Sequence, residues 1–185
     1  MLYAQVHLTL PAWIHHEIDH QKLYTDETEQ MALAIQLSAL NVREQTGGPF
    51  GAALFSESGR LLGVGVNRVI PTNCSTAHAE IMAFATAQQR IQQYRLNEMG
   101  ERVTLASSSQ PCAMCYGASF WAGIDRILIG ACSADVQTLA GFDEGPLPSD
   151  WLGEWQKRGI SVQCDLLRDK ACAVLKEYGE SGLVY

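Results

Sequence analysis

Two short segments constrain the fold of this chain more than any other feature. They are His78-Ala79-Glu80 and Pro111-Cys112-Ala113-Met114-Cys115, and each stands near the start of a predicted helix. Cys112 and Cys115 are three residues apart, so they share one helix face and their sulfurs can converge on one ion. The free N–H groups of a first helical turn favour the thiolate form. The fold must therefore bring two helix N-termini together.

The spacing of apolar residues and turn signals predicts a layered α/β fold. We expect helices over residues 10–21, 26–46, 76–93, 111–122 and 166–178, with a further short helix after residue 131. We expect strands over residues 50–56, 61–68, 102–107, 125–131 and 159–164. Because helices follow several strands, crossover connections make part of the sheet parallel. The pattern predicts a three-layer α/β/α sandwich with a mixed central sheet.

Charge and cysteine usage limit the partners and the compartment. The chain carries 13 Lys and Arg against 20 Asp and Glu, a net charge of −7, so its overall field does not attract nucleic acid. Residues 103–124 are uncharged and long enough to span a bilayer, but polar residues at their centre predict buried structure and no membrane contact. The first basic residue is Lys22, so we expect no secretory signal and a cytoplasmic protein with reduced thiols.

His78, Cys112 and Cys115 form a candidate zinc site. Two thiolates and a neutral imidazole balance the charge of Zn²⁺, and three protein ligands leave the fourth position open for water, as in catalytic sites. A redox pair, or a structural zinc completed by Cys74 or Cys132, is the alternative. The order H-x-E…P-C-x-x-C is a known signature of zinc deaminases and favours the catalytic site. Glu80 lies close enough to take a proton from water and pass it to a ring nitrogen.

The chain resembles the cytidine/deoxycytidylate deaminase superfamily and, within it, the guanine deaminases. The matching motifs are Gly47-Gly48-Pro49-Phe50-Gly51-Ala52, Thr76-Ala77-His78-Ala79-Glu80, residues 111–118, Phe120-Trp121-Ala122 and Gly141-Phe142-Asp143-Glu144. The first three also occur in tRNA adenosine deaminases, whereas the last two are typical of the guanine branch. Gln110 departs from the Glu that is common before Pro-Cys, and the N-terminal extension is longer than usual.

The resemblance implies a Zn²⁺-dependent hydrolase that converts a free purine base, guanine, to xanthine and ammonia. It implies that Glu144 acts as a second catalytic acid, and that the base is bound by Asn67, Phe50, Ala79, Trp121 and Tyr185. Plain core packing is the alternative role for Phe50 and Trp121, and a solvated loop carboxylate is the alternative for Glu144. A tRNA adenosine deaminase, a deaminase of cytosine or an aminotriazine, and a zinc-stabilised binding protein without turnover are the other functions considered.

The resemblance also implies an organisation for the whole chain. Within a single domain over residues 1–185, we expect an N-terminal extension (1–25), a catalytic core (26–165) and a C-terminal helix with a closing tail (166–185). We expect a homodimer in which Tyr185 reaches over a substrate pocket, its own or the partner's, with the C-terminal segments exchanged in the second case. A frayed terminus is the alternative for this tail.

Overall fold

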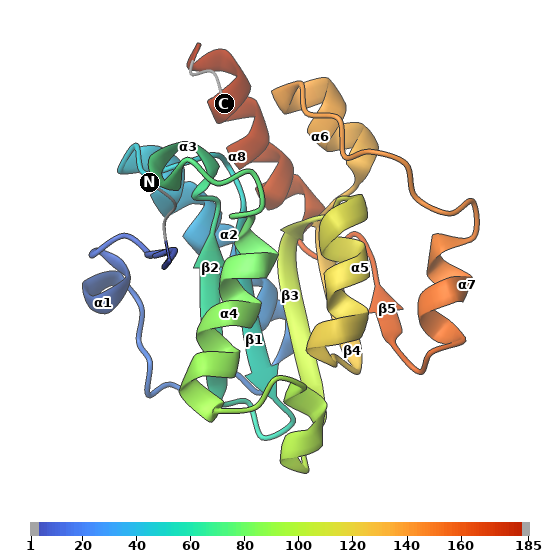
Figure 1. The fold of residues 1–185 in the computed structure, drawn as a ribbon. Coiled ribbons are helices and arrows are strands. Elements are labelled where there is room, and N and C mark those ends of the chain that lie inside the picture. Colours follow the sequence, from blue (N-terminus) through green and yellow to red (C-terminus); the bar gives the residue numbers. More distant parts are fainter. Residues whose placement is uncertain (1–3, 183–185) are drawn as a thin grey trace.

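A mixed five-stranded sheet forms the middle layer of the computed structural model, which describes residues 4–182 (Figure 1). The strand order is β2-β1-β3-β4-β5. Strand β1 (Gly51–Ser56) pairs antiparallel with β2 (Leu61–Val66) and with β3 (Val103–Ser109). Strands β4 (Arg126–Ala131) and β5 (Ser161–Gln163) continue the sheet in parallel from β3. The predicted mixed sheet is confirmed.

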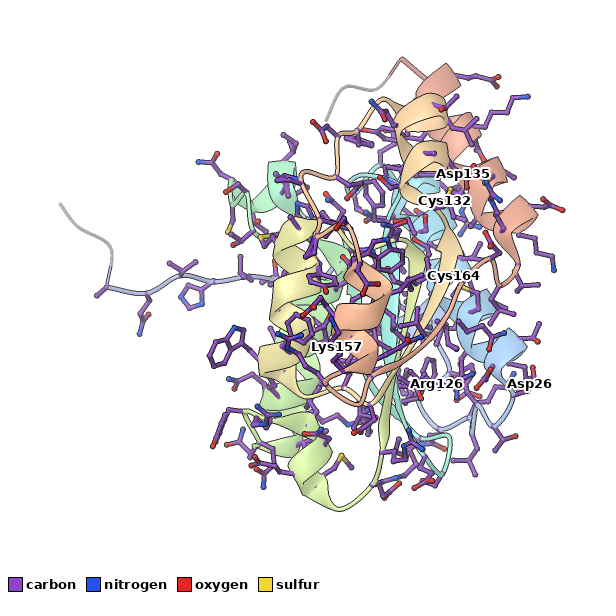
Figure 2. The ribbon with its side chains drawn as sticks, turned by 90° about the vertical axis from the view of Figure 1, so that its right-hand side faces the viewer. Asp26, Arg126, Cys132, Asp135, Lys157 and Cys164 are labelled. Carbon is purple, nitrogen blue, oxygen red and sulfur yellow. The ribbon has the colours of Figure 1, made fainter. Side chains whose placement is uncertain are left out.

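Helices cover both faces of the sheet, as Figure 2 shows edge-on. One face carries α4 (Ala79–Ile91), α5 (Ala113–Ala122) and α7 (Trp151–Gln156), and the other carries α2 (Glu27–Arg43), α6 (Ser133–Ala140) and α8 (Arg168–Glu180). Buried side chains of alternate strand residues point into two separate apolar cores, one for each face. This arrangement confirms the three-layer sandwich. No helix within residues 4–182 is long and apolar enough to cross a membrane.

Short elements complete the chain and adjust the predicted boundaries. The helix predicted at residues 10–21 is only α1 (Ile14–Glu17), and it packs on the α2 side through Ile14 and Ile18. The short α3 (Val69–Thr72) and the 3₁₀ turn η1 (Leu96–Met99) were not predicted. Asp26 caps α2, because its side chain accepts hydrogen bonds from the N–H groups of the first turn.

Glycine in the strands sets how closely the helices approach. A Cβ on Gly65 of β2 would lie 1.9 Å from the carbonyl oxygen of Ala79, the first residue of α4. A Cβ on Gly51 of β1 would lie 2.3 Å from the carbonyl oxygen of Ala34 in α2. Only glycine allows these contacts. The start of α4, which carries the His-Ala-Glu motif, is therefore held directly against the sheet.

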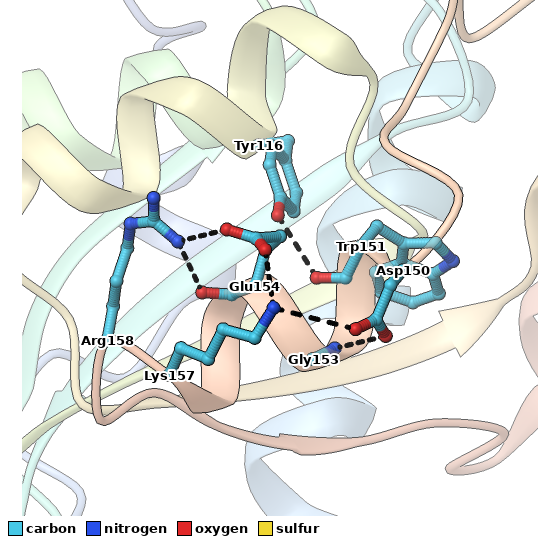
Figure 3. A network of polar contacts seen from close by, with 7 residues as sticks. All are labelled: Tyr116, Asp150, Trp151, Gly153, Glu154, Lys157 and Arg158. Carbon is cyan, nitrogen blue, oxygen red and sulfur yellow. Dashed lines mark hydrogen bonds and ion pairs between the residues drawn. The ribbon is translucent and has the colours of Figure 1, made fainter.

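A hydrogen bond from Tyr116 joins α5 to α7, and further polar contacts within the α7 segment surround it (Figure 3). The Tyr116 hydroxyl of α5 donates a 3.0 Å hydrogen bond to the Trp151 carbonyl oxygen. Asp150 caps α7 through the Gly153 N–H, and Glu154 forms ion pairs with Lys157 and Arg158. The sequence did not predict α7, since it is short and follows a loop rich in Gly, Asp and Pro. The contact of α7 with α5 is made at Tyr116, the residue that follows Cys115.

Candidate active site

His78, Cys112 and Cys115 meet where α4 and α5 begin. His78 is the N-cap residue of α4, Cys112 is the N-cap residue of α5, and Cys115 lies in the first turn of α5. One ligand atom from each residue lies within 4.8 Å of the others, and His78 Nδ1 is 3.5 Å from Cys112 Sγ. The structure therefore brings the three sequence-predicted ligands together, by placing two helix N-termini side by side.

The donor set fits Zn²⁺. Two thiols and one imidazole supply soft and borderline donors at distances that let them converge on one ion. Among the described residues, no fourth Cys, His, Asp or Glu joins this cluster, and neither Cys74 nor Cys132 belongs to it. The site thus has the three protein ligands of a catalytic zinc and not the four of a structural one.

The three ligand side chains are electrostatically coupled, and Cys112 is the one whose anionic form is favoured. Hydrogen bonds from Cys115 and His78 together lower the pKa of Cys112 to about 4, against the opposing effect of burial. The pKa of Cys115 is raised, because it shares its proton with Cys112 and is buried. Burial lowers the pKa of His78, but contact with Cys112 and the charge of Glu80 outweigh it and the net shift is upward.

Glu80 lies in the first turn of α4, next to the ligand cluster. Its side chain is buried, and the Ser107 hydroxyl donates to Glu80 Oε1 at 3.4 Å. Burial raises the pKa of Glu80, and the nearby charge of Cys112 raises it further. A carboxyl group whose pKa is raised holds its proton at higher pH than an exposed one, and its carboxylate form is a stronger base, which suits general acid–base catalysis.

A cavity of about 320 Å³ opens beside the cluster. The lining residues come from the segment before β1, the end of β3, the starts of α4 and α5, and the loop after α6: Phe50, His78, Ala79, Glu80, Ser109, Gln110, Cys112, Ala113, Met114, Phe142, Asp143, Glu144 and Gly145. Burial raises the pKa of Glu144 to about 8, with help from the charges of Glu80 and Cys112. Two carboxyl groups of raised pKa thus share one small cavity with the candidate metal ligands.

Only some of the other residues predicted to bind the substrate line the cavity. Phe50 and Ala79 line the cavity, but Asn67 and Trp121 do not. Asn67 is buried at the end of β2, where its side-chain oxygen accepts a hydrogen bond from the Val69 N–H at 3.3 Å. Tyr185 lies outside the described residues.

The expectation that Trp121 walls the cavity within its own chain is not met. Trp121 is 80% exposed near the C-terminal end of α5. Cys112 stands at the opposite end of this helix, about 13 Å away along the axis at 1.5 Å per residue. The sequence also missed the roles of Gln110, Ser109 and Phe142 as lining residues. In the sequence, only the position of these three residues beside or within the motifs could have indicated that they line the cavity.

Comparisons with known proteins agree with this site. Residues 24–131 match the family model for the cytidine and deoxycytidylate deaminase zinc-binding region. A tRNA-specific adenosine deaminase of Buchnera aphidicola is 32% identical over 130 residues, which are 70% of this chain and 79% of that protein.

Solved structures extend the likeness to nearly the whole chain. A guanine deaminase from Nitrosomonas europaea is 38% identical, with a TM-score of 0.91 over 97% of this chain and 99% of that one. A structure solved with 2,6-diaminopurine is 40% identical, with a TM-score of 0.90 over 97% of this chain and 95% of that one. The family match and the ligand cluster together show that this chain belongs to the zinc-binding cytidine and deoxycytidylate deaminase family.

Proposed function

We propose that the protein hydrolyses guanine to xanthine and ammonia. The observation that carries this proposal is a pair of carboxyl groups, buried Glu80 and half-buried Glu144, that line one cavity beside the His-Cys-Cys cluster. Removal of the amine at C2 needs one group to move the proton of the attacking water and another to assist the departing amine. The likeness to a guanine deaminase over 97% of the chain supports guanine as the substrate.

His78, Cys112 and Cys115 are proposed as the zinc ligands. Zinc held there supplies Lewis-acid activation of the attacking water. Glu80 takes a proton from that water and passes it to the ring nitrogen next to C2. Glu144 delivers a proton to the exocyclic amine as the C2–N bond breaks, and it regains a proton from the C2 hydroxyl as that oxygen becomes the carbonyl of xanthine. One water is consumed and one ammonia leaves. Glu144 holds its proton at higher pH than an exposed carboxyl, as the role of acid requires. The raised pKa of Glu80 makes its carboxylate form a stronger base toward the attacking water.

The base is proposed to lie between Phe50 and the loop that carries Glu144. Phe50 and Ala79 line the cavity and offer an apolar ring and a backbone edge to the purine. Asn67 is proposed to reach the edge of the base with its side chain. Its backbone N–H donates to the Phe50 carbonyl oxygen at 3.1 Å, which places Asn67 next to Phe50 at the end of β2. Tyr185 is proposed to close the cavity from the C-terminal tail.

We also propose a cytoplasmic homodimer that works in purine breakdown. Trp121 on α5 and Tyr94 after α4 are 80% and 76% exposed, which is unusual for large aromatic side chains and is typical of contact surfaces. In this arrangement the partner subunit covers Trp121. All six cysteines are free, which supports a reducing compartment. Residues 1–185 are proposed to act as one catalytic domain.

Adenosine deamination in tRNA is the second candidate function, because the Buchnera enzyme matches 70% of this chain. The net charge of −7 weighs against an RNA substrate, since phosphate contacts need a basic face. An ammonia-release assay over guanine, guanosine, adenine, cytosine, cytidine and tRNA decides between the two. We expect xanthine from guanine alone. Inosine in tRNA without xanthine from guanine would reverse the assignment.

A further inference from the structure

Three aromatic rings connect the cavity to the C-terminal helix. The ring centroids of Phe50 and Phe142 are 5.2 Å apart in an edge-on contact. The rings of Phe142 and Tyr178 are 5.9 Å apart and stacked, with 30° between their planes. Phe50 and Phe142 line the cavity, whereas Tyr178 lies behind them on α8 and is only 5% exposed.

The loop that bears Phe142 also bears Glu144. Phe142 follows Gly141, the residue that ends α6, and Glu144 is two residues further along. On its cavity side this loop is tied to α5, because the Ala113 N–H donates to the Glu144 carbonyl oxygen at 3.0 Å. On its other side the Phe142 ring rests on Tyr178. The loop is therefore held between α5, which carries two candidate metal ligands, and α8.

Helix α8, which carries Tyr178, packs closely against α6. Its neighbour Gly179 lies so close to the end of α6 that a Cβ there would meet the Leu139 carbonyl oxygen at 2.0 Å. At the other end of α8, Arg168 forms an ion pair with Asp135 of α6 at 2.7 Å. Helix α8 therefore contacts α6 near both of its ends, and these contacts fix the position of Tyr178 relative to the loop.

We propose that Tyr178 is a positioning residue for base binding, which acts through Phe142 and does not touch the substrate. Its ring fixes the angle of Phe142, and Phe142 with Phe50 forms the apolar wall against which a planar base lies. Loss of the Tyr178 ring frees Phe142 to rotate, so the wall must be ordered each time a base binds. This inference rests on the proposed function only for the identity of the base.

The test compares Tyr178→Leu, Tyr178→Phe and a matched control, Leu175→Ala. Leu175 lies on the same helix and is 2% exposed, but it is not part of the ring stack. The readout is KM for guanine, because destabilisation that lowers the folded fraction lowers apparent kcat and leaves KM unchanged. We expect Tyr178→Leu to raise KM about tenfold, the upper range for one aromatic pair. We expect Tyr178→Phe and Leu175→Ala to keep the KM of the natural sequence.

A double variant tests whether Tyr178 acts through Phe142. If Tyr178 acts through Phe142, then Phe142→Leu with Tyr178→Leu raises KM no more than Phe142→Leu alone. An unchanged KM in Tyr178→Leu, an equal rise in Leu175→Ala or Tyr178→Phe, or additive effects in the double variant would overturn the proposal.

Binding without turnover separates this inference from the proposed function. In a Glu80→Gln background, calorimetric titration with 2,6-diaminopurine should show the same ranking of the variants in Kd. If the natural sequence does not deaminate guanine but the ranking holds, the proposed function fails and the positioning role stands. If guanine is deaminated and the ranking is absent, only the positioning role fails.

Discussion

The backbone carbonyl oxygen of Glu144 accepts a hydrogen bond from the N–H of Ala113, the residue that directly follows Cys112, at 3.0 Å. Ala113 N–H belongs to the first turn of α5, where N–H groups have no partner within the helix. The bond ties the loop after α6 to the helix that carries two candidate ligands. It holds the Glu144 side chain in the cavity although Glu144 is distant from Cys112 in the sequence.

Replacement of Glu144 should slow turnover more than it weakens binding. Glu144→Gln keeps the size of the side chain but cannot deliver a proton in the transition state. We expect kcat for guanine to fall by about 10²- to 10⁴-fold, the usual contribution of a general acid or base, with little change in KM. Steady-state kinetics measures both constants. Glu57→Gln is the matched control, since Glu57 is exposed and lies outside the cavity. Unchanged kcat in Glu144→Gln would leave Glu144 as a loop carboxylate.

The pH dependence of kcat follows from the raised pKa of Glu144. Burial, with the charge of Glu80, raises this pKa from the ordinary 4.5 to about 8. Glu144 therefore keeps its proton at neutral pH and loses it as the pH rises through about 8. Because the proposed step needs the protonated form, kcat should fall on the alkaline side of this value. A kcat that rises through the same range would contradict the assignment of Glu144 as the acid.

Removal of the metal should abolish turnover and lower thermal stability. A chelator that extracts zinc takes away an ion bound only by the folded state, so Tm should decrease, and added Zn²⁺ should restore both properties. Cys112→Ser should fail to retain zinc. Cys164→Ser is the control, because Cys164 is exposed and lies outside the ligand cluster. Full activity of the chelated protein, with zinc absent by elemental analysis, would exclude the metal role.

The ion pair of Asp135 and Arg168 should contribute modestly to the free energy of unfolding, and this contribution should decrease as the pH falls. The hydrogen bonds from Arg168 hold the pKa of Asp135 well below its ordinary value, and Figure 2 shows Asp135 beside Cys132 at the start of α6. A depressed pKa means that the stabilisation is present above the unfolded pKa of Asp, about 3.9, and is lost as the pH falls through the lower folded value. Asp135→Asn should cost about 1 kcal/mol in urea unfolding at pH 7. A larger loss at pH 3 than at pH 7 would contradict this account.

The sequence predicted those parts of the fold that depend on local pattern. The helix starts near His78 and Cys112, and the strands that precede them, follow from caps, turn residues and apolar spacing. The face of α5 that carries Trp121 could not be predicted in this way, since an aromatic residue on a helix suits a core, a pocket or an interface equally. The stack of Phe142 on Tyr178 joins segments far apart in the sequence, and no local pattern encodes it.

The most direct test of the account is the xanthine formed from guanine by Glu80→Gln, measured together with its zinc content. Glu80 is buried beside the ligands and is not itself one of them, so the variant should bind one zinc per chain. It should lose nearly all turnover, because the amide cannot carry the proton from water to the ring. Zinc retention with xanthine production near that of the natural sequence would contradict the proposed chemistry.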